Sequence, residues 1–389
     1  MELVIKLKNP RDGYAQLLQV ERSHGMHFRS NSLLGQDTGI FRAEIPAMAI
    51  NKVDDLRDDS RIQHVEQNRI LGLMPNESAI AVNTDPNKRP KKPNDPLYPK
   101  QWHLDMIEMP KAWQRSTGKG AVVAVLDTGV AFKCLAKDRP HLADLDSRRC
   151  VEPYNATNGS KDAWDGMGHG SHVSGTVGQD TDNGYGCAGV APDSRIMPVK
   201  VLTDQGYGSI SDIADGIYYA VKKGAHVISM SLGGTGYSPV LHQACKDAHK
   251  AGVLVVAAAG NNGDDEPHYP AAYPEVMAVS AVGPDAIITE YSSYGDFVNI
   301  AAPGGNTRKF GEDGGVLQES VYQGKAQFVS WNGTSMSCPS VSGTAALLIQ
   351  KGVKGSDRLW EVITSSAVDR GDPYKYGSGL LNAWNALTK

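Results

Sequence analysis

Short runs of apolar, often β-branched residues alternate with longer amphipathic stretches along most of the chain. The runs are continuous, and they predict strands at 121–126, 195–201, 226–230, 253–258, 276–282 and 297–301. Amphipathic stretches predict helices at 209–223, 239–251 and 335–351. Continuous apolar strands separated by helices are typical of parallel sheets with both faces covered. The pattern therefore predicts an α/β fold in three layers around a parallel sheet.

The first part of the chain has a different texture. Residues 3–7 and 62–66 look like strands, and a charged segment at 47–56 looks like a helix, which together predict a small α+β domain. Residues 75–93 hold several prolines and a basic cluster but no apolar periodicity, which is typical of a linker. We therefore divide the chain into 1–74, 75–93 and 94–389.

Composition narrows the class of protein. The chain has 389 residues, a formal net charge of −4 and a hydrophobic fraction of 40%, as in an ordinary soluble protein. No apolar run is long enough to span a membrane, and the slightly acidic balance disfavours a general nucleic-acid surface. Five cysteines without a CxxC motif exclude a disulfide scaffold or a zinc ribbon. Residues 1–8 lack the apolar core of a signal peptide, so we expect a cytoplasmic protein, or a secreted one whose leader was trimmed.

Three polar residues stand where chemistry is expected in such a sheet. Asp127 ends the run 121–126, His169 lies between glycines at a helix start, and Ser335 begins the apolar helix after Asn332-Gly333-Thr334. Each has an ordinary structural explanation when taken alone: a turn aspartate, a core histidine and an N-cap serine. His169 and His172 could suggest a metal, but no HExxH motif or cysteine partner supports one.

The combination is more specific than its parts. A serine nucleophile needs a base to accept its proton and a carboxylate to orient that base. The order Asp127, His169, Ser335 fits this requirement. An α/β-hydrolase would need a histidine after the serine, and residues 336–389 contain none.

On these motifs the chain resembles the subtilisin-like serine proteases (subtilases, peptidase family S8). The resemblance rests on Asp127-Thr128-Gly129, on the segment 169–175 (HGSHVSG) and on the segment 333–337 (GTSMS), and it extends from about 94 to 382. It implies a serine endopeptidase, expected to be a monomer, that acts on peptide or protein substrates. It also implies that Asp127 orients the base His169, that Ser335 is the nucleophile, and that Asn261 is the oxyanion-hole amide.

The same resemblance implies where a peptide binds. Ser231, Leu232 and Gly233 match one substrate strand of the family, and Gly206, Tyr207 and Gly208 match the opposite edge. Pairing with strand edges holds an extended peptide without reading most of its side chains. The acidic residues 264–266 follow Asn261 and could favour a basic P1 residue or could be a solvated loop.

The N-terminal domain resembles the family's propeptide, an intramolecular inhibitor, so we expect a zymogen. The resemblance to the family's propeptide implies that Met74 lies at P1 and Leu71 at P4, which favours a large apolar P1 residue. Pro75 would then lie at P1′, where proline usually blocks cleavage. We therefore expect slow maturation or a cut elsewhere in 75–93, for instance near Lys88-Arg89.

Family members commonly bind Ca²⁺ in the loop after the histidine helix. The resemblance implies ligands from Thr181, Asn183, Tyr185 and Cys187, with Asp95 as a further ligand and Asp144 as the carboxylate from the loop after Asp127; a metal-free turn is the alternative. Cys134 and Cys150 flank an atypical loop and could pair in an oxidising compartment.

Alternatives to general endopeptidase activity remain open. The same site could transfer its acyl group to an amine, as in a peptide ligase or macrocyclase. Alternatively, the protein could be a processing protease dedicated to one substrate. An inactive scaffold is disfavoured because Asp127, His169, Ser335 and Asn261 are all present.

Overall fold

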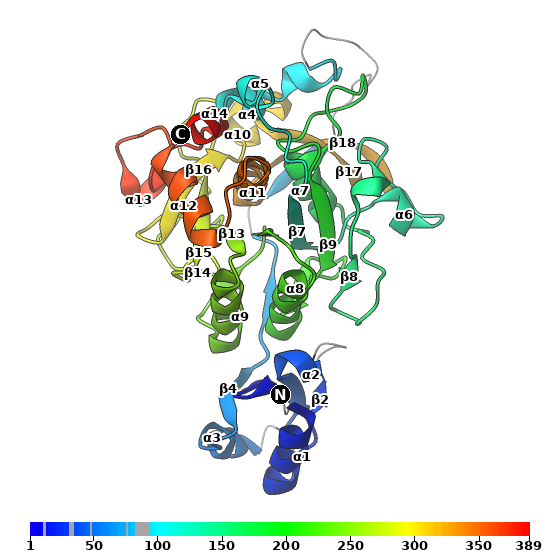
Figure 1. Cartoon of the computed structure of the whole chain (residues 1–389), viewed down its shortest axis with the longest axis vertical. Helices are drawn as coiled ribbons and strands as arrows, with labels where there is room; N and C mark the ends of the chain where they lie inside the picture. Colours follow the sequence, from blue (N-terminus) through cyan, green and yellow to red (C-terminus); the bar gives the residue numbers. More distant parts are fainter. Residues whose placement is uncertain (11–12, 31–34, 47–48, 75–76, 82–92) are drawn as a thin grey trace.

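A seven-stranded parallel sheet forms the centre of the molecule (Figure 1). The structure is a computed structural model and describes residues 1–10, 13–30, 35–46, 49–74, 77–81 and 93–389. The strand order is β16-β15-β13-β11-β7-β9-β8, and every neighbouring pair is parallel. The strands are β7 (Val122–Asp127), β8 (Tyr154–Asn155), β9 (Arg195–Lys200), β11 (Val227–Met230), β13 (Leu254–Ala258), β15 (Val276–Val282) and β16 (Val298–Pro303). The predicted parallel α/β fold is confirmed.

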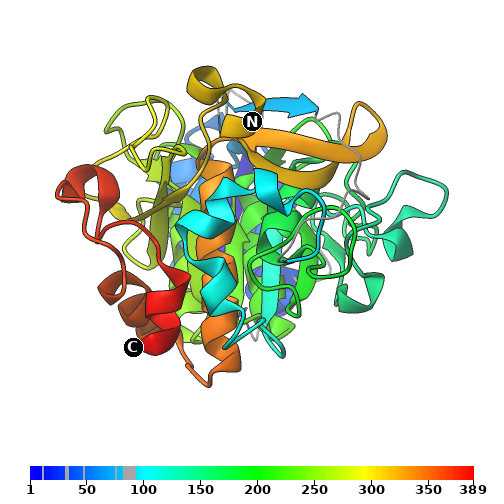
Figure 2. The same ribbon diagram turned by 90° about the horizontal axis from the view of Figure 1, so that it is seen from above.

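Helices cover both faces of this sheet. On one face lie α7 (His169–Gly178) and α11 (Thr334–Gln350), and α11 runs through the middle of the domain (Figure 2). On the other face lie α8 (Ile210–Lys222) and α9 (Pro239–Lys250), which pack against each other (Figure 1). The result is the predicted three-layer arrangement.

Strand β7 shows why its sequence is continuously apolar. Val123 and Val125 belong to the core that contains α11, whereas Val122, Ala124 and Leu126 belong to the core beneath α8 and α9. Because successive side chains point to opposite faces, a strand covered on both sides needs apolar residues at every position. The carboxylate of Asp127 comes where this requirement ends, at the carboxyl end of the strand.

Shorter elements complete the domain around the sheet. The hairpin β17 (Val316–Tyr322) and β18 (Lys325–Asn332) packs over α7 and leads into α11. The remaining elements are η3 (Tyr98–Lys100), α4 (Trp102–Met106), α5 (Met109–Ala112), α6 (Lys133–Ala136), η4 (Ser147–Arg149), β10 (Tyr207–Ser209), β12 (Gly234–Thr235), β14 (His268–Tyr269), α10 (Thr307–Phe310), η5 (Glu312–Gly314), α12 (Ser356–Ser365), α13 (Pro373–Tyr376) and α14 (Ala383–Thr388).

The N-terminal residues fold into a separate small sheet. Its antiparallel strands lie in the order β2-β3-β1-β4. They are β1 (Glu2–Leu7), β2 (Arg29–Ser30), β3 (Ile40–Glu44) and β4 (Ile62–Gln67), with α1 (Gly13–His24), α2 (Gly35–Thr38) and α3 (Lys52–Arg57). Leu3, Ile5 and Leu7 form its core together with residues of α1 and α3. The sequence reading found β1, β4 and part of α3 but not α1 or β3.

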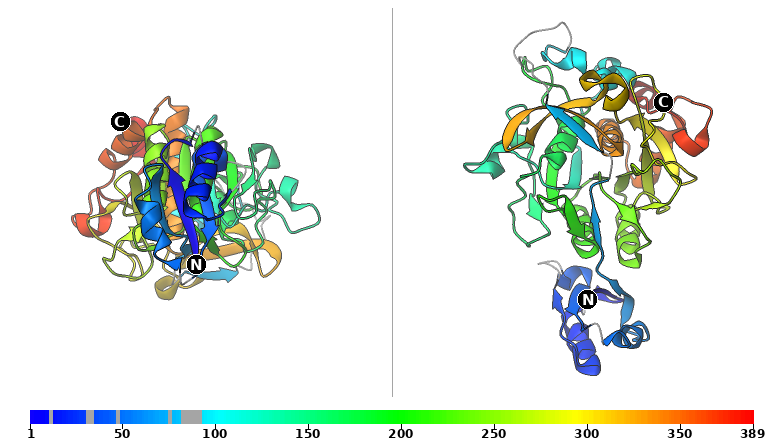
Figure 3. Two further views of the ribbon diagram at one scale, coloured as in Figure 1. Left: turned by 90° about the horizontal axis from the view of Figure 1, so that it is seen from below. Right: turned by 180° about the vertical axis from the view of Figure 1, so that it is seen from behind.

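The other face of the small sheet lies against α8 and α9 (Figure 3, left). Val4 belongs to the core of the large domain, and Lys6 stacks on Tyr218 with its ammonium 4.5 Å from the ring centroid. Glu66 Oε1 accepts hydrogen bonds from Ser238 Oγ at 2.7 Å and from the Val240 amide at 3.0 Å. This carboxylate therefore caps the N-terminus of α9, where the helix dipole favours negative charge.

From β4 the chain runs upward into the large domain and crosses it (Figures 1 and 3). Strand β5 (Ile70–Gly72) pairs antiparallel with β10, and β6 (Ser78–Ala81) pairs antiparallel with β18. The stretch predicted as a linker therefore contains a strand. Most of that stretch (75–76 and 82–92), with Pro75 and the suggested cut near 88–89, lies outside the described residues. Among the helices that the structure describes, none is long and apolar enough to cross a membrane.

We predict that Glu66→Ala loosens the docking of the N-terminal sheet. The substitution leaves the Val240 amide without its carboxylate partner, which costs about 1–3 kcal/mol. Hydrogen exchange of β1 and β4 amides, measured on a Ser335→Ala chain to prevent self-digestion, should become faster by the corresponding factor. Glu44→Ala is the matched control, because the Glu44 side chain is 74% exposed; equal exchange in the two variants would contradict the capping role.

Candidate active site

Asp127 and His169 form a buried pair at the carboxyl edge of the sheet. Asp127 ends β7, His169 begins α7, and neither is exposed to solvent. His169 Nδ1 lies 2.7 Å from Asp127 Oδ1, which also accepts the Thr128 amide at 2.7 Å. The carboxylate therefore fixes the imidazole with Nε2 pointing toward the cleft.

The glycines around His169 serve close packing. A Cβ on Gly170 would lie 2.2 Å from the Gly129 carbonyl oxygen, and one on Gly168, whose φ is +104°, would lie 1.8 Å from that of Val321. The glycines do not leave the imidazole open, because His169 is completely buried. Its neighbour His172 is structural: Nε2 lies 3.0 Å from the Val316 carbonyl oxygen, and burial lowers its pKa to about 3.

Ser335 and Asn261 reach the same place from other elements. Ser335 is the second residue of α11, and Asn261 follows β13 by a short turn. Asn261 Oδ1 accepts hydrogen bonds from the Thr334 amide at 2.8 Å and from Thr334 Oγ1 at 2.7 Å. These bonds fix the side-chain amide so that Nδ2 is directed into the cleft beside Ser335.

A carboxylate that the sequence reading missed lies among these groups. Glu77 Oε1 accepts a hydrogen bond from Ser335 Oγ and lies 3.3 Å from Asn261 Nδ2, while Oε2 lies 3.1 Å from His169 Nε2. The Glu77 side chain is 7% exposed. Ser335, His169 and Asn261 therefore converge on one carboxylate, which comes from the N-terminal part of the chain.

Two opposing effects set the protonation of His169. Its burial disfavours the charged imidazolium, but the negative charges of Asp127 and Glu77 prevail and hold its pKa well above the ordinary value of 6.5. A histidine between two carboxylates is the arrangement in which the charged form is favoured. In the intact chain we therefore expect His169 to be protonated at neutral pH.

The predicted substrate strands hold the chain's own residues. In the β5–β10 pair, Tyr207 lies opposite Gly72 and Gly208 opposite Leu71. The Gly206 carbonyl accepts the Leu73 amide at 3.0 Å. On the other side, Gly233 and Gly72 form an antiparallel bridge. The N-terminal segment thus lies between the two predicted strands.

Apolar side chains of that segment are buried against the predicted strands. Met74 is 4% exposed, and a Cβ on Gly233 would lie 2.4 Å from its Cε. Leu71 is 6% exposed and lies next to Gly234. Leu232 is buried, and Ser231 donates to the Ser335 carbonyl at 2.8 Å.

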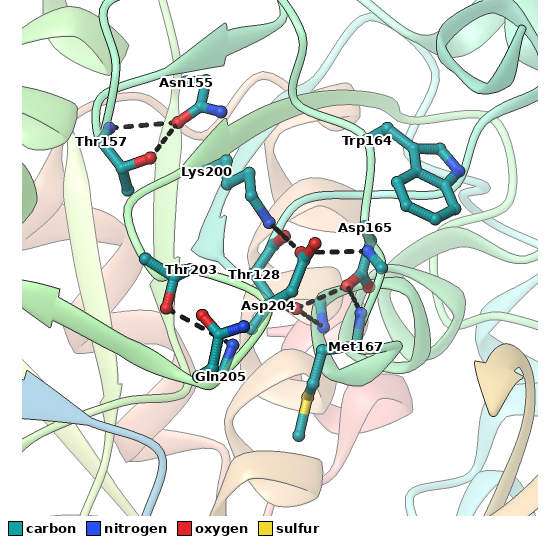
Figure 4. A network of polar contacts seen from close by, with 12 residues as sticks. Thr128, Asn155, Thr157, Trp164, Asp165, Met167, Lys200, Thr203, Asp204 and Gln205 are labelled. Carbon is teal, nitrogen blue, oxygen red and sulfur yellow. Dashed lines mark hydrogen bonds and ion pairs between the residues drawn. The ribbon is translucent and has the colours of Figure 1, made fainter. Parts of the chain in front are cut away.

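A polar network, buried at Thr128 and Asp165 and exposed at Asp204, holds the loop that follows Asp127 (Figure 4). Thr128 Oγ1 donates to Asp165 Oδ1 at 2.9 Å, and Asp165 Oδ2 accepts the Ser171 amide at 2.8 Å. Lys200 Nζ donates to the Thr128 carbonyl and to Asp204 at 2.7 Å. Asp165 thus links the first turn of α7, through the Ser171 amide, to the loop after Asp127, although the N-cap position itself is Gly168.

The residues named for calcium also lie together, away from the cleft. Asp95 and Asp144 are fully buried on either side of Asn183. The backbone N–H of Asn183 donates to Asp95 Oδ1 at 3.2 Å, and the side-chain Nδ2 of Asn183 donates to Asp144 Oδ1 at 2.8 Å. Thr181, Tyr185 and Cys187 belong to the same loop, and the Cys187 amide donates to Asp144 at 2.8 Å. Within the described ranges, no three or more His, Cys, Asp or Glu side chains lie together so that they could hold a metal ion by themselves.

Two other expectations concern the acidic loop and the cysteines. Asp265 and Glu266 are exposed, and Asp265 accepts a hydrogen bond from the Tyr374 hydroxyl at 2.9 Å, which favours the solvated-loop interpretation. All five cysteines are free thiols. Burial and the neighbouring Cys134 raise the pKa of Cys150, so these two thiols are close in space.

Comparisons with known proteins agree with this geometry. Residues 118–379 match the model of the subtilase family. The chain is 38% identical to Subtilisin Savinase of Lederbergia lenta over 284 residues, covering 72% of this chain and 96% of that protein. It is 35% identical to Thermitase of Thermoactinomyces vulgaris over 296 residues, covering 76% of this chain and 99% of that protein.

Solved structures give the same answer. A protease from Pseudoalteromonas arctica superposes with a TM-score of 0.70 at 34% identity, covering 77% of this chain and 99% of the other. Fervidolysin from Fervidobacterium pennivorans, a keratinolytic enzyme related to subtilisin, has a similar fold over the whole chain, with a TM-score of 0.78 at 24% identity and 61% of its own length covered. The chain therefore belongs to the subtilase family and is a subtilisin-like serine endopeptidase.

Proposed function

We propose that the protein is made as a zymogen and hydrolyses peptide bonds with Asp127, His169, Ser335 and Asn261. Residues 1–74 act as the inhibitory propeptide, 75–93 as the connection and 94–389 as the catalytic domain. The observation that carries the proposal is the convergence of Ser335 Oγ, His169 Nε2 and Asn261 Nδ2 on a single carboxylate. A group with oxygens at these positions occupies the place where a reacting carbonyl has to lie.

The mechanism follows from the directions of these groups. Asp127 holds Nδ1 of His169, so Nε2 is left to accept the proton of Ser335 Oγ as that oxygen attacks the peptide carbonyl carbon. Asn261 Nδ2 and the Ser335 backbone amide stabilise the negative charge that develops on the carbonyl oxygen. His169 then passes the proton to the leaving amine, and water attacks the acyl-enzyme to release the acid.

The substrate is an extended peptide that replaces β5 between β10 and Gly233. Main-chain pairing on both sides makes binding tolerant of sequence, whereas buried pockets select particular side chains. The burial of Met74 and Leu71 supports a preference for large apolar residues at P1 and P4. The acidic residues 264–266 are then part of a solvated loop.

Calcium is proposed as a structural ion in the loop after α7. Asp95, Asp144, Asn183 and the carbonyl groups of Thr181, Tyr185 and Cys187 offer the oxygen ligands that Ca²⁺ prefers. The support is the complete burial of the two carboxylates, because buried negative charge is costly without a positive partner. The ion would hold the loop to the N-terminal end of the domain and would take no part in catalysis.

Ser335→Ala should abolish peptide hydrolysis and stop maturation of the full chain.

Asn261→Ala should retain the triad and lower kcat by about 10²–10³, a magnitude known from subtilisin itself. Hydrolysis of a fluorogenic peptide and N-terminal sequencing of the product measure both effects. Normal turnover by Ser335→Ala would refute the nucleophile assignment.

Removing calcium should lower the thermal midpoint of the Ser335→Ala chain, and added Ca²⁺ should restore it. Binding at 100 times Kd stabilises a protein by about 2.7 kcal/mol. Asp144→Asn in the same chain should make the midpoint insensitive to EDTA, whereas Asp313→Asn, at a side chain 77% exposed, should not. A midpoint that EDTA leaves unchanged in the Asp313→Asn control would exclude the ion.

The ion pair between His169 and Glu77 should make stability depend on pH. Because the pKa of His169 is raised in the folded chain, the pair stabilises the fold fully below pH 6.5 and is lost as the pH rises through the raised pKa. We compare thermal midpoints of Ser335→Ala with those of Ser335→Ala/Glu77→Gln. The difference should be constant in mild acid and should shrink at alkaline pH; a difference that grows with pH would contradict the pairing.

A further inference from the structure

The group that closes the cleft is a side-chain carboxylate rather than a peptide carbonyl. Met74, the residue expected at P1, is buried beside Gly233, but the oxygens next to Ser335, Asn261 and His169 belong to Glu77. We propose that Glu77 is the residue that inhibits the intact chain, and that its carboxylate prevents the chain from cutting itself, so that the first cut is made by another molecule. This inference rests on the zymogen function proposed above.

Glu77 is held in place from both sides. Upstream, β5 is bonded to β10 and Gly72 to Gly233; downstream, β6 begins at Ser78, which pairs with Asn332 of β18. Gly333 lies directly beneath the side chain, since a Cβ there would be 2.8 Å from Glu77 Cγ. The carboxylate therefore depends on two anchored strands and not on its own contacts alone.

The contacts of Glu77 block the nucleophile, the base and the oxyanion-hole amide in turn. Its Oε1 accepts a hydrogen bond from Ser335 Oγ, whose proton His169 would have to remove, and its Oε2 faces His169 Nε2, the base nitrogen. A protonated Nε2 cannot accept a second proton, so the nucleophile is not activated. The Asn261 amide, which a substrate oxyanion needs, faces Glu77 Oε1 at 3.3 Å.

A carboxylate at this position is also chemically inert. Attack by Ser335 on the Glu77 carboxyl carbon would at most form an ester and release water, taking up the proton of His169, and water would hydrolyse that ester back to the carboxylate; no peptide bond is cut and no net change results. The inhibitor therefore cannot be consumed by the site that it blocks. Cutting the chain requires an active site that is already free, and such a site belongs to a different molecule.

The test is the rate at which a fluorophosphonate probe labels Ser335 in the freshly purified, uncut full chain. Glu77→Gln keeps the size of the side chain and removes its charge, and Glu77→Ala removes both. We expect both variants to label about 10- to 100-fold faster than wild type, the range expected for losing a hydrogen bond to a charged group. Glu44→Gln, whose side chain is 74% exposed on the N-terminal domain, is the control and should label at the wild-type rate.

Hydrogen exchange of the Glu77→Gln chain separates this role from a general loosening of the N-terminal domain. Protection of β5 and β6 should persist while labelling accelerates. Accelerated labelling accompanied by loss of that protection would assign inhibition to the strands and overturn the role of Glu77.

The second measurement is the kinetic order of the first cut, that is, how its rate depends on the concentration of the chain. The half-time for conversion of wild-type chain should shorten in proportion as its concentration is raised, and Ser335→Ala chain should be cut only when mature enzyme is added. A half-time independent of concentration would overturn the inference.

Labelling of the Glu77 variants at the wild-type rate, with the matured enzyme active on peptides, would overturn the inference and leave the proposed function intact. Absence of labelling and of peptide hydrolysis in every form, the matured one included, would overturn both.

Discussion

The hydrogen bond between Asp127 and His169 imposes the main constraint on this structure. Both groups are fully buried, and a buried carboxylate is tolerated only when it is paired and hydrogen-bonded. The parallel sheet supplies the place, because the carboxyl end of β7 and the start of α7 meet at one edge. The Thr128–Asp165 bond and the Lys200 ammonium then hold the loop that carries Asp127. The packing of the large core therefore holds the His169 imidazole in one orientation.

An enzyme that binds peptides by strand pairing must keep strand edges open. Open edges are also sites of unwanted association. In the full chain both edges are occupied by the chain itself: β10 pairs with β5, and Gly233 forms a bridge with Gly72. The N-terminal domain adds a second, larger contact through Val4, Lys6 and Glu66. The segment that contacts Ser335 and His169 therefore also covers these edges.

Much of the large domain could be predicted because each sheet strand is apolar on both faces. The predicted 276–282 coincides with β15, and the other five predicted strands differ from the observed ones by one or two residues, whereas the short β8 was not predicted. The hairpin β17–β18 was missed for a physical reason. Gln318, Glu319 and Ser320 are polar yet buried, and each forms a side-chain hydrogen bond with another segment of the chain: Gln318 Nε2 with the Ala188 carbonyl, Glu319 with the Asp144 amide and Ser320 with the Gly168 carbonyl. A pattern of hydrophobic and polar positions cannot reveal such a strand.

Asp127, His169 and Ser335 could be selected because a nucleophile, a base and a carboxylate form a recognisable set with a known order. Glu77 belongs to no such set. It is 258 residues from Ser335 in the chain, and its position depends on two strand pairings that local sequence does not encode. The substrate site that the motifs predicted is therefore only half of the intact protein's active site. The other half is the Glu77 carboxylate, whose contacts with Ser335 and His169 only the folded chain reveals.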